Sequence, residues 1–257
     1  MAKNDFSAES AENYDQKCLC VLVLDTSGSM REIVDNSNVT YTGETVYMDG
    51  KQYNLVTGGI SKMDLLNQGL QEFYNAVIED DTTSQRLELS IITFNDTIQV
   101  VQEPALVDNV TIPTLQGEGD TAMADAVNEA IDKVEARKQW YKSTGQPYYR
   151  PWIILMTDGV PNRDQDMESL AFRIKNDTNA KKYVFLPVGV EGADMEVLQK
   201  IAGNGMSAVK LKGMRFAKFF KWLSASMGTV TKSEEGQTID LSFGATGEAG
   251  WIDSFVI

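Results

Sequence analysis

Histidine is absent from the 257 residues of this chain. Its absence excludes serine–histidine and cysteine–histidine nucleophile systems, a histidine general base, and every zinc site that uses imidazole. A metal bound by this chain would therefore meet oxygen ligands, which favours Mg²⁺, Mn²⁺ or Ca²⁺. Catalysis by a carboxylate, a lysine or metal-bound water stays open.

Cysteine is nearly absent as well. Cys18 and Cys20, the only two, lie two positions apart in an apolar segment that we expect to be a strand, so their side chains would share one face. A disulfide at that spacing would be strained, and a structural zinc site needs more ligands. We interpret both as small buried residues of a protein in a reducing compartment.

Basic side chains are in the minority: 23 Lys and Arg stand against 37 Asp and Glu, for a formal net charge of −14. An acidic surface repels phosphate backbones and anionic lipids, so we expect neither nucleic acid nor a membrane as partner. No apolar run reaches the roughly 18 residues of a membrane span. The polar start of the chain lacks the basic segment and apolar core of a signal peptide, and we expect a cytoplasmic protein.

Apolar segments alternate with amphipathic ones along most of the chain. The expected strands are 18–24, 87–94, 98–101, 151–156, 183–190 and 207–211, and the expected helices are 61–78, 121–136, 164–176, 194–202 and 214–226. Unbroken apolar strands between helices predict a doubly wound α/β domain with a mostly parallel sheet. The tight connection at Asn95-Asp96 predicts that the next strand returns antiparallel at one edge.

We divide the chain into a flexible N-terminal arm (1–16), one α/β domain (17–228) and a C-terminal tail (229–257). The domain carries an insertion at 31–60, in which Asp49-Gly50 predicts the turn of a β-hairpin, because this pair accepts positive φ. The hairpin is either merely exposed, or it brings Asp35, Glu44 and Asp49 toward the loops at the strand ends. The apolar end of the tail, 251–257, is either an edge strand or cap of the domain, or a docking segment.

Polar loops follow two of the expected strands, and a third precedes a helix. These loops are Asp25-Thr-Ser-Gly-Ser29, Thr157-Asp-Gly159 and Gly119-Asp-Thr121. The carboxyl ends of parallel strands form the ligand crevice of an open sheet, so we expect five side chains to converge there: Asp25, Ser27, Ser29, Thr121 and Asp158. Hydroxyl and carboxylate oxygens suit a hard divalent cation.

The three loops in this order resemble the metal-ion-dependent adhesion site of von Willebrand factor A domains. Ser29-Met30 and Thr157-Asp-Gly-Val-Pro161 are similar to a bacterial intracellular branch that includes proteins associated with tellurite resistance. The resemblance covers residues 18–227 and implies a binding module rather than an enzyme. Its partner would be a protein of a bacterial stress or tellurite response, such as a kinase–phosphatase pair, or an AAA+ ATPase.

The resemblance also implies a role for each candidate residue. Ser27 and Ser29 would bind Mg²⁺ through Oγ, and Thr121 would join them when a ligand is present. Asp25 and Asp158 would act through water, and a carboxylate from the partner would fill the open position. Hydroxyl ligands leave the charge of the cation under-neutralised, so an incoming Asp or Glu is attracted strongly.

Other interpretations remain. Asp25-Thr-Ser-Gly-Ser29 alone could be a plain turn. Gly117-Glu-Gly-Asp-Thr-Ala122 matches a dinucleotide-binding pattern, but its two acids would repel a pyrophosphate. Asp25 could serve as the nucleophile of a Mg²⁺-dependent phosphatase, although such enzymes need a second Asp two residues on, where this chain has Ser27.

Overall fold

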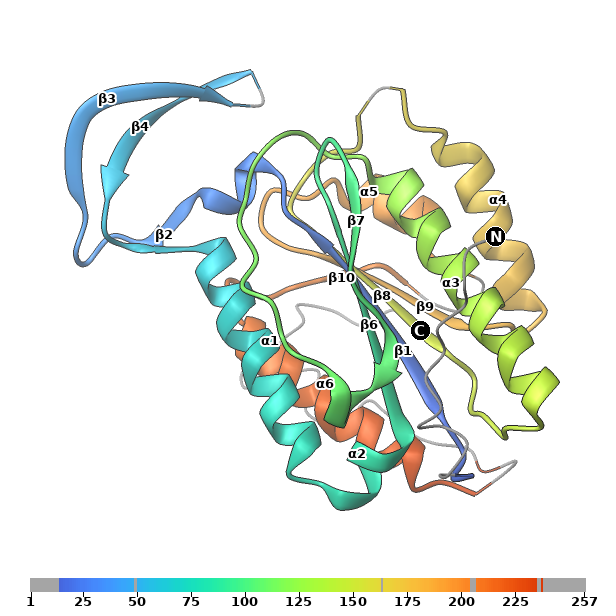
Figure 1. Ribbon diagram of the computed structural model, residues 1–257. Helices are drawn as coiled ribbons and strands as arrows, with labels where there is room; N and C mark the ends of the chain where they lie inside the picture. The colour runs from blue at the N-terminus through green and yellow to red at the C-terminus, as the bar shows by residue number, and fades with distance from the viewer. Residues whose placement is uncertain (1–13, 49, 163, 204–206, 235–236, 238–257) are drawn as a thin grey trace, which may run out of the picture.

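The computed structural model describes residues 14–48, 50–162, 164–203, 207–234 and 237 (Figure 1). Within these residues the main sheet has six strands in the order β10-β9-β8-β1-β6-β7. The strands are β1 (Cys18–Asp25), β6 (Leu87–Phe94), β7 (Ile98–Leu106), β8 (Trp152–Thr157), β9 (Val184–Gly189) and β10 (Val209–Lys210). Five of them run parallel and β7 returns antiparallel along β6, which confirms the predicted fold class and its antiparallel edge.

The central strand, β1, is buried along its whole length. Cys18, Cys20 and Leu22 face one hydrophobic core, whereas Leu19 and Val21 face the other. A strand covered by helices on both sides has no solvent face, which is why its sequence is apolar throughout. The two cysteines share a face as predicted, and both are free thiols.

Helices cover both faces of the sheet (Figure 1). α1 (Lys62–Ile78) and α6 (Phe216–Thr231) pack on the face that holds Cys18, beside the short α2 (Asp81–Arg86). α3 (Met123–Thr144), α4 (Met167–Asn179) and α5 (Met195–Ile201) pack on the other face. None of the described helices is long and apolar enough to cross a membrane.

Two parts of this helical layer differ from the sequence prediction. A short helix that was not among the predicted ones, α2, follows α1, and Asp80 caps it by accepting a hydrogen bond from the Thr83 amide. α3 begins two residues after Thr121 and continues well past Ala136, to the left-handed Gly145. The predicted helix 61–78 is present as α1, and Ser61 and Asp64 form a reciprocal capping box at its start.

The predicted hairpin insertion is present and projects from the sheet edge at which β1 ends (Figure 1). A 3₁₀ turn, η2 (Gly28–Arg31), leads into the insertion, and β2 (Ile33–Asp35) pairs with β5 (Ile60–Ser61) at its root. β3 (Thr40–Met48) and β4 (Lys51–Thr57) form the hairpin. The predicted arm lies almost wholly outside the described residues, and so does the end of the tail, 251–257.

Candidate metal centre

The first site loop is organised around Asp25, the last residue of β1. Its side chain is fully buried; Oδ1 accepts the Ser27 amide at 2.8 Å and Oδ2 accepts the Thr157 hydroxyl. This turn places the Ser27 and Ser29 hydroxyl oxygens 3.0 Å apart. Two of the predicted hydroxyl ligands therefore lie side by side, above a fixed carboxylate.

Asp158 reaches the same point from the neighbouring strand. β8 runs parallel to β1 with Leu24 opposite Met156, so the loops after the two strands emerge together. The Ser29 hydroxyl donates to Asp158 Oδ1 at 2.7 Å, and only 3% of Asp158 is exposed. Residues 129 positions apart are thereby in direct contact.

Thr121 is carried to the site by an extended segment before α3. The Gly28 amide donates to the Gly119 carbonyl and the Glu118 amide to the Thr26 carbonyl, both at 2.8 Å, and these bonds fasten the segment to the first loop. Thr121 itself is buried, and its amide donates to the Asn162 side chain at 3.1 Å.

Gly159 shows how closely Thr121 approaches the carboxylates. A Cβ atom added at Gly159 would lie 2.9 Å from Thr121 Oγ1 and 3.3 Å from Asp25 Oδ2. The Thr121 hydroxyl and the Asp25 carboxylate therefore border one small space that a larger residue would fill. The structure thus brings all five predicted site residues together at the carboxyl ends of the strands.

Two ionised carboxylates, those of Asp25 and Asp158, repel each other in this buried cluster. Burial, and then the nearby charge of Asp158, raise the pKa of Asp25 to about 7, although hydrogen bonds from Ser27 and Thr157 act in the opposite direction. A cation would relieve this repulsion. Among the described residues no three Asp, Glu or Cys side chains gather into a metal site, so hydroxyl oxygens would supply much of the coordination. The donor set fits a hard divalent cation.

Two charged residues at this site were not predicted from the sequence. Lys62, buried at the start of α1, lies 2.8 Å from Asp158 Oδ2 and 2.7 Å from Glu32 Oε2. Glu32 and Lys62 belong to the two roots of the insertion. Neither stands in a motif, because only the tertiary fold brings the start of α1 beside β8.

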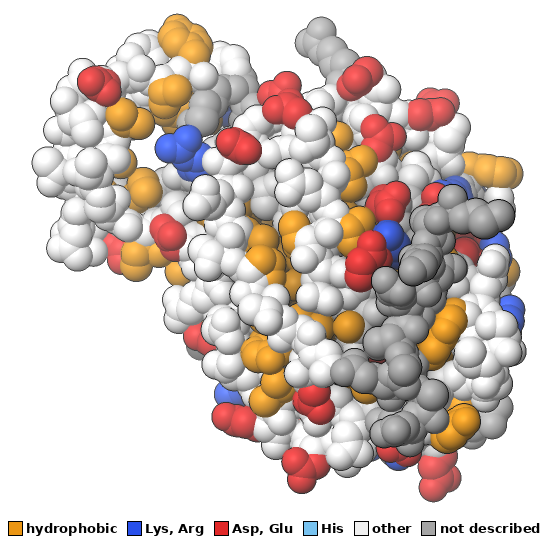
Figure 2. Space-filling model, viewed as in Figure 1, with side chains coloured by type: hydrophobic (Ala, Val, Ile, Leu, Met, Phe, Trp, Pro, Cys, Tyr) orange, Lys and Arg blue, Asp and Glu red, His pale blue; other side chains and the backbone are white. Residues whose placement is uncertain are grey.

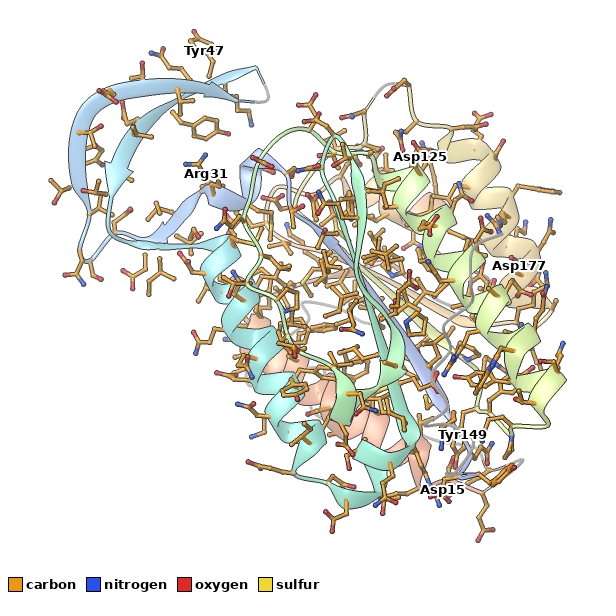
Figure 3. The ribbon with its side chains drawn as sticks, viewed as in Figure 1. Asp15, Arg31, Tyr47, Asp125, Tyr149 and Asp177 are labelled. Atoms are coloured by element: carbon orange, nitrogen blue, oxygen red, sulfur yellow. The ribbon has the colours of Figure 1, made fainter. Side chains whose placement is uncertain are left out.

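A groove of about 800 Å³ lies beside the metal centre, between the hairpin and the body. Gly28 and Ser29 of the site loop line it together with Arg31, apolar side chains such as Tyr53 and Leu55, and the carboxylates of Glu32, Asp64 and Glu118. Figure 2 shows the hairpin standing apart from the body across a hollow, and Figure 3 places Arg31 between them.

Of the three insertion carboxylates considered above, the two that the structure describes form no hydrogen bond or ion pair with the site loops. Glu44 and Asp35 are exposed, and Asp35 accepts a hydrogen bond from the Ser37 amide within its own turn. Asp49 lies outside the described residues. Glu44 and Asp35 therefore agree with the interpretation that the hairpin is merely exposed. Glu32, at the start of the insertion, does approach the site, because it pairs with Lys62.

In an open doubly wound sheet, ligands bind at the carboxyl ends of the strands, which is where the hydroxyl and carboxylate side chains of this chain lie. The family model for the von Willebrand factor type A domain matches residues 62–219, more than half of the chain. The chain belongs to that family. The match begins at Lys62, so it does not include the first site loop, residues 25–29. The contacts in the structure, and not the family model, place that loop beside Thr121 and Asp158.

Solved structures are similar to this chain at low sequence identity. The PilB minor pilin from Streptococcus sanguinis, as a D319A mutant, is 15% identical with a TM-score of 0.58; the alignment covers 83% of this chain and 62% of the pilin. Proximal thread matrix protein 1 from the mussel byssus, with a zinc-occupied MIDAS motif, is 18% identical with a TM-score of 0.48, covering 86% and 46%. The chain thus spans less than two thirds of each of these proteins. No curated protein matches the sequence significantly.

Proposed function

We propose that this chain is a non-enzymatic protein-binding module that depends on a divalent metal. The observation that carries the proposal is the convergence of five oxygen-bearing side chains from three distant segments beside a fastened loop and an adjoining groove. Membership of the von Willebrand factor A family supports it.

The five residues would have different roles toward the metal. Ser27, Ser29 and Thr121 present neutral hydroxyls and would hold the metal directly, with Mg²⁺ the first choice and Mn²⁺ or Ca²⁺ possible substitutes. Asp25 and Asp158, each already engaged by hydrogen bonds, would act through water. A bound divalent cation would supply an open coordination position for an Asp or Glu of the partner.

The groove indicates the direction from which the partner approaches. Ser29 lines both the metal centre and the groove, so a chain whose acidic side chain reaches the centre can lie along the hairpin. The apolar side chains there would contact residues beside the acid, and Arg31, for which the described residues show no ion pair, would face a second carboxylate. The partner would then be a protein segment with acidic and apolar residues.

A phosphatase that uses Asp25 is less consistent with this geometry. Both oxygens of Asp25 accept hydrogen bonds and the side chain has no exposed surface, whereas a nucleophile must be reached by its substrate. From the resemblance of residues 29–30 and 157–161 to the bacterial intracellular branch, we propose a regulatory or scaffold subunit of a stress or tellurite response, working with a kinase–phosphatase pair in the cytoplasm; an adaptor of an AAA+ ATPase is the alternative.

The test combines metal binding with partner capture. Free Mn²⁺ is followed by electron paramagnetic resonance in titrations of the wild type, Ser27→Ala, and the exposed control Ser143→Ala. We expect Ser27→Ala to weaken Mn²⁺ binding by about tenfold or more, and the control to leave it unchanged. A protein retained from bacterial lysate in Mg²⁺ should be lost with EDTA and with Ser27→Ala.

Two results would contradict the proposed function. One is a wild-type chain that binds no Mn²⁺. The other is a retained protein that ignores both EDTA and the Ser27→Ala substitution.

A further inference from the structure

Lys62 is a buried cation whose every donor is used. Only 3% of its side chain is exposed, and its ammonium contacts Asp158 Oδ2 at 2.8 Å, Glu32 Oε2 at 2.7 Å and the Glu191 carbonyl oxygen at 3.0 Å. An ammonium has three N–H donors, and three acceptors surround this one. A lysine this deeply buried is costly unless it is paired, so its position depends on the site around it.

The two oxygens of Asp158 consequently have different partners. Oδ2 accepts from Lys62, while Oδ1 accepts from the Ser29 hydroxyl at 2.7 Å. The carboxylate is held in one orientation, with a single oxygen toward the hydroxyl ligands. Asp158 cannot turn both oxygens toward a metal without breaking its bond to Lys62.

The same ammonium joins the metal centre to the root of the hairpin. Glu32 precedes β2 and Lys62 follows β5, and the Lys62 amide donates to the Glu32 carbonyl at 3.1 Å. The Glu32 side chain is 52% exposed, so solvent screens its charge more than it screens that of the buried Asp158. The charge of Lys62 therefore offsets the charge of Asp158 more fully than the charge of Glu32 offsets that of Lys62.

We propose that Lys62 is a positioning residue that keeps Asp158 from turning both oxygens toward a metal and offsets its charge, so that a metal bound here keeps a positive charge for the carboxylate of the partner. This inference rests on the proposed function. Asp25 and Asp158 would together balance the two charges of the cation, and the ammonium leaves the centre net positive. The chain gives up metal affinity and gains attraction for an anionic ligand.

The experiment compares Lys62→Met with wild type, with the charge-preserving Lys62→Arg, and with the surface control Lys133→Met. Mn²⁺ affinity is measured by electron paramagnetic resonance, and acetate binding to the Mn²⁺-loaded protein by water proton relaxation. Loss of a like charge near the cation should tighten Mn²⁺ by about three- to tenfold. Acetate should bind Lys62→Met more weakly by a similar factor, and Lys62→Arg should restore the wild-type balance.

Glu32→Gln gives a second test at an exposed position, which does not depend on the folding of Lys62→Met. Removing this carboxylate strengthens the effect of the ammonium, so Mn²⁺ should bind about two- to threefold more weakly and acetate more tightly. A purely structural lysine would change the melting temperature without moving the two affinities in opposite directions.

The outcomes separate this inference from the proposed function. A wild type without Mn²⁺ binding overturns both. A wild type that binds Mn²⁺ overturns the Lys62 inference alone if a folded Lys62→Met binds Mn²⁺ no more tightly. If Lys62→Met does not fold, an unchanged or tighter Mn²⁺ affinity of Glu32→Gln overturns it in the same way.

Discussion

Gly159 leaves open the small space that Thr121 and Asp25 border. We expect Gly159→Ala to weaken Mn²⁺ binding by about tenfold, because the new methyl group would press on Thr121 Oγ1 at 2.9 Å and approach Asp25 Oδ2 at 3.3 Å. Titration of Mn²⁺ followed by electron paramagnetic resonance measures this. Gly228→Ala in α6 is the matched control, because its added methyl group meets only Thr83 Oγ1, at 3.5 Å. Equal affinities of the two variants would contradict the described site.

The five candidate site residues could be predicted from the sequence because each stands in a polar loop next to an apolar strand or a helix start. Their convergence follows from a general property of parallel sheets. Lys62 and Glu32 could not be predicted in the same way. A lysine at the first position of a helix is ordinarily solvated, and only its burial against Asp158 shows that it belongs to the site.

We expect the domain to keep its core when the hairpin insertion is removed. Tyr41 and Tyr47 are 69% and 72% exposed, and β3 pairs with β4 rather than with the main sheet. Replacing residues 37–58 with Gly-Gly should keep the β2–β5 root. We expect unchanged Mn²⁺ affinity and a melting temperature within about 4 °C of wild type, with loss of the Mg²⁺-dependent partner.

Electron paramagnetic resonance with Mn²⁺, calorimetry and the capture assay measure these three effects on the shortened chain. Retention of the partner at wild-type affinity would show that the groove plays no part in binding. A collapse of the melting temperature would show instead that the hairpin supports the core.

The extent of α3 shows where element prediction from sequence stops. The apolar stripe ends at Val134, but the helix continues because Arg137 and Tyr141 turn inward to Glu88, with Arg137 nitrogens 2.7 and 2.6 Å from its two oxygens. This polar turn of the helix is buried because Glu88 on β6 pairs with its side chains. The periodicity of hydrophobic residues along the sequence cannot predict such a pairing.

At the scale of the whole molecule, a metal that binds only the folded chain must stabilise it. Mg²⁺ at about ten times its Kd should add about 1.4 kcal/mol to the free energy of unfolding, which raises the melting temperature by about 3–6 °C for a domain of this size. Thermal unfolding in Mg²⁺ and in EDTA measures the difference. Ser29→Ala, which removes a hydroxyl of the centre, should abolish most of it. Identical melting of the wild type in both buffers would contradict metal binding at this site.

Local patterns in the amino-acid sequence were enough to predict the α/β class, the antiparallel edge, the hairpin and the five candidate site residues. These follow from local properties: apolar runs, helical periodicity, turn residues and hydroxyls at strand ends. Only the tertiary structure decided that Lys62 pairs with Asp158, that Arg137 is buried against Glu88, and that a groove opens beside Ser29. Each of these depends on segments that meet across the fold, and the free energy of a buried ion pair or a groove is set by that contact rather than by neighbours along the chain.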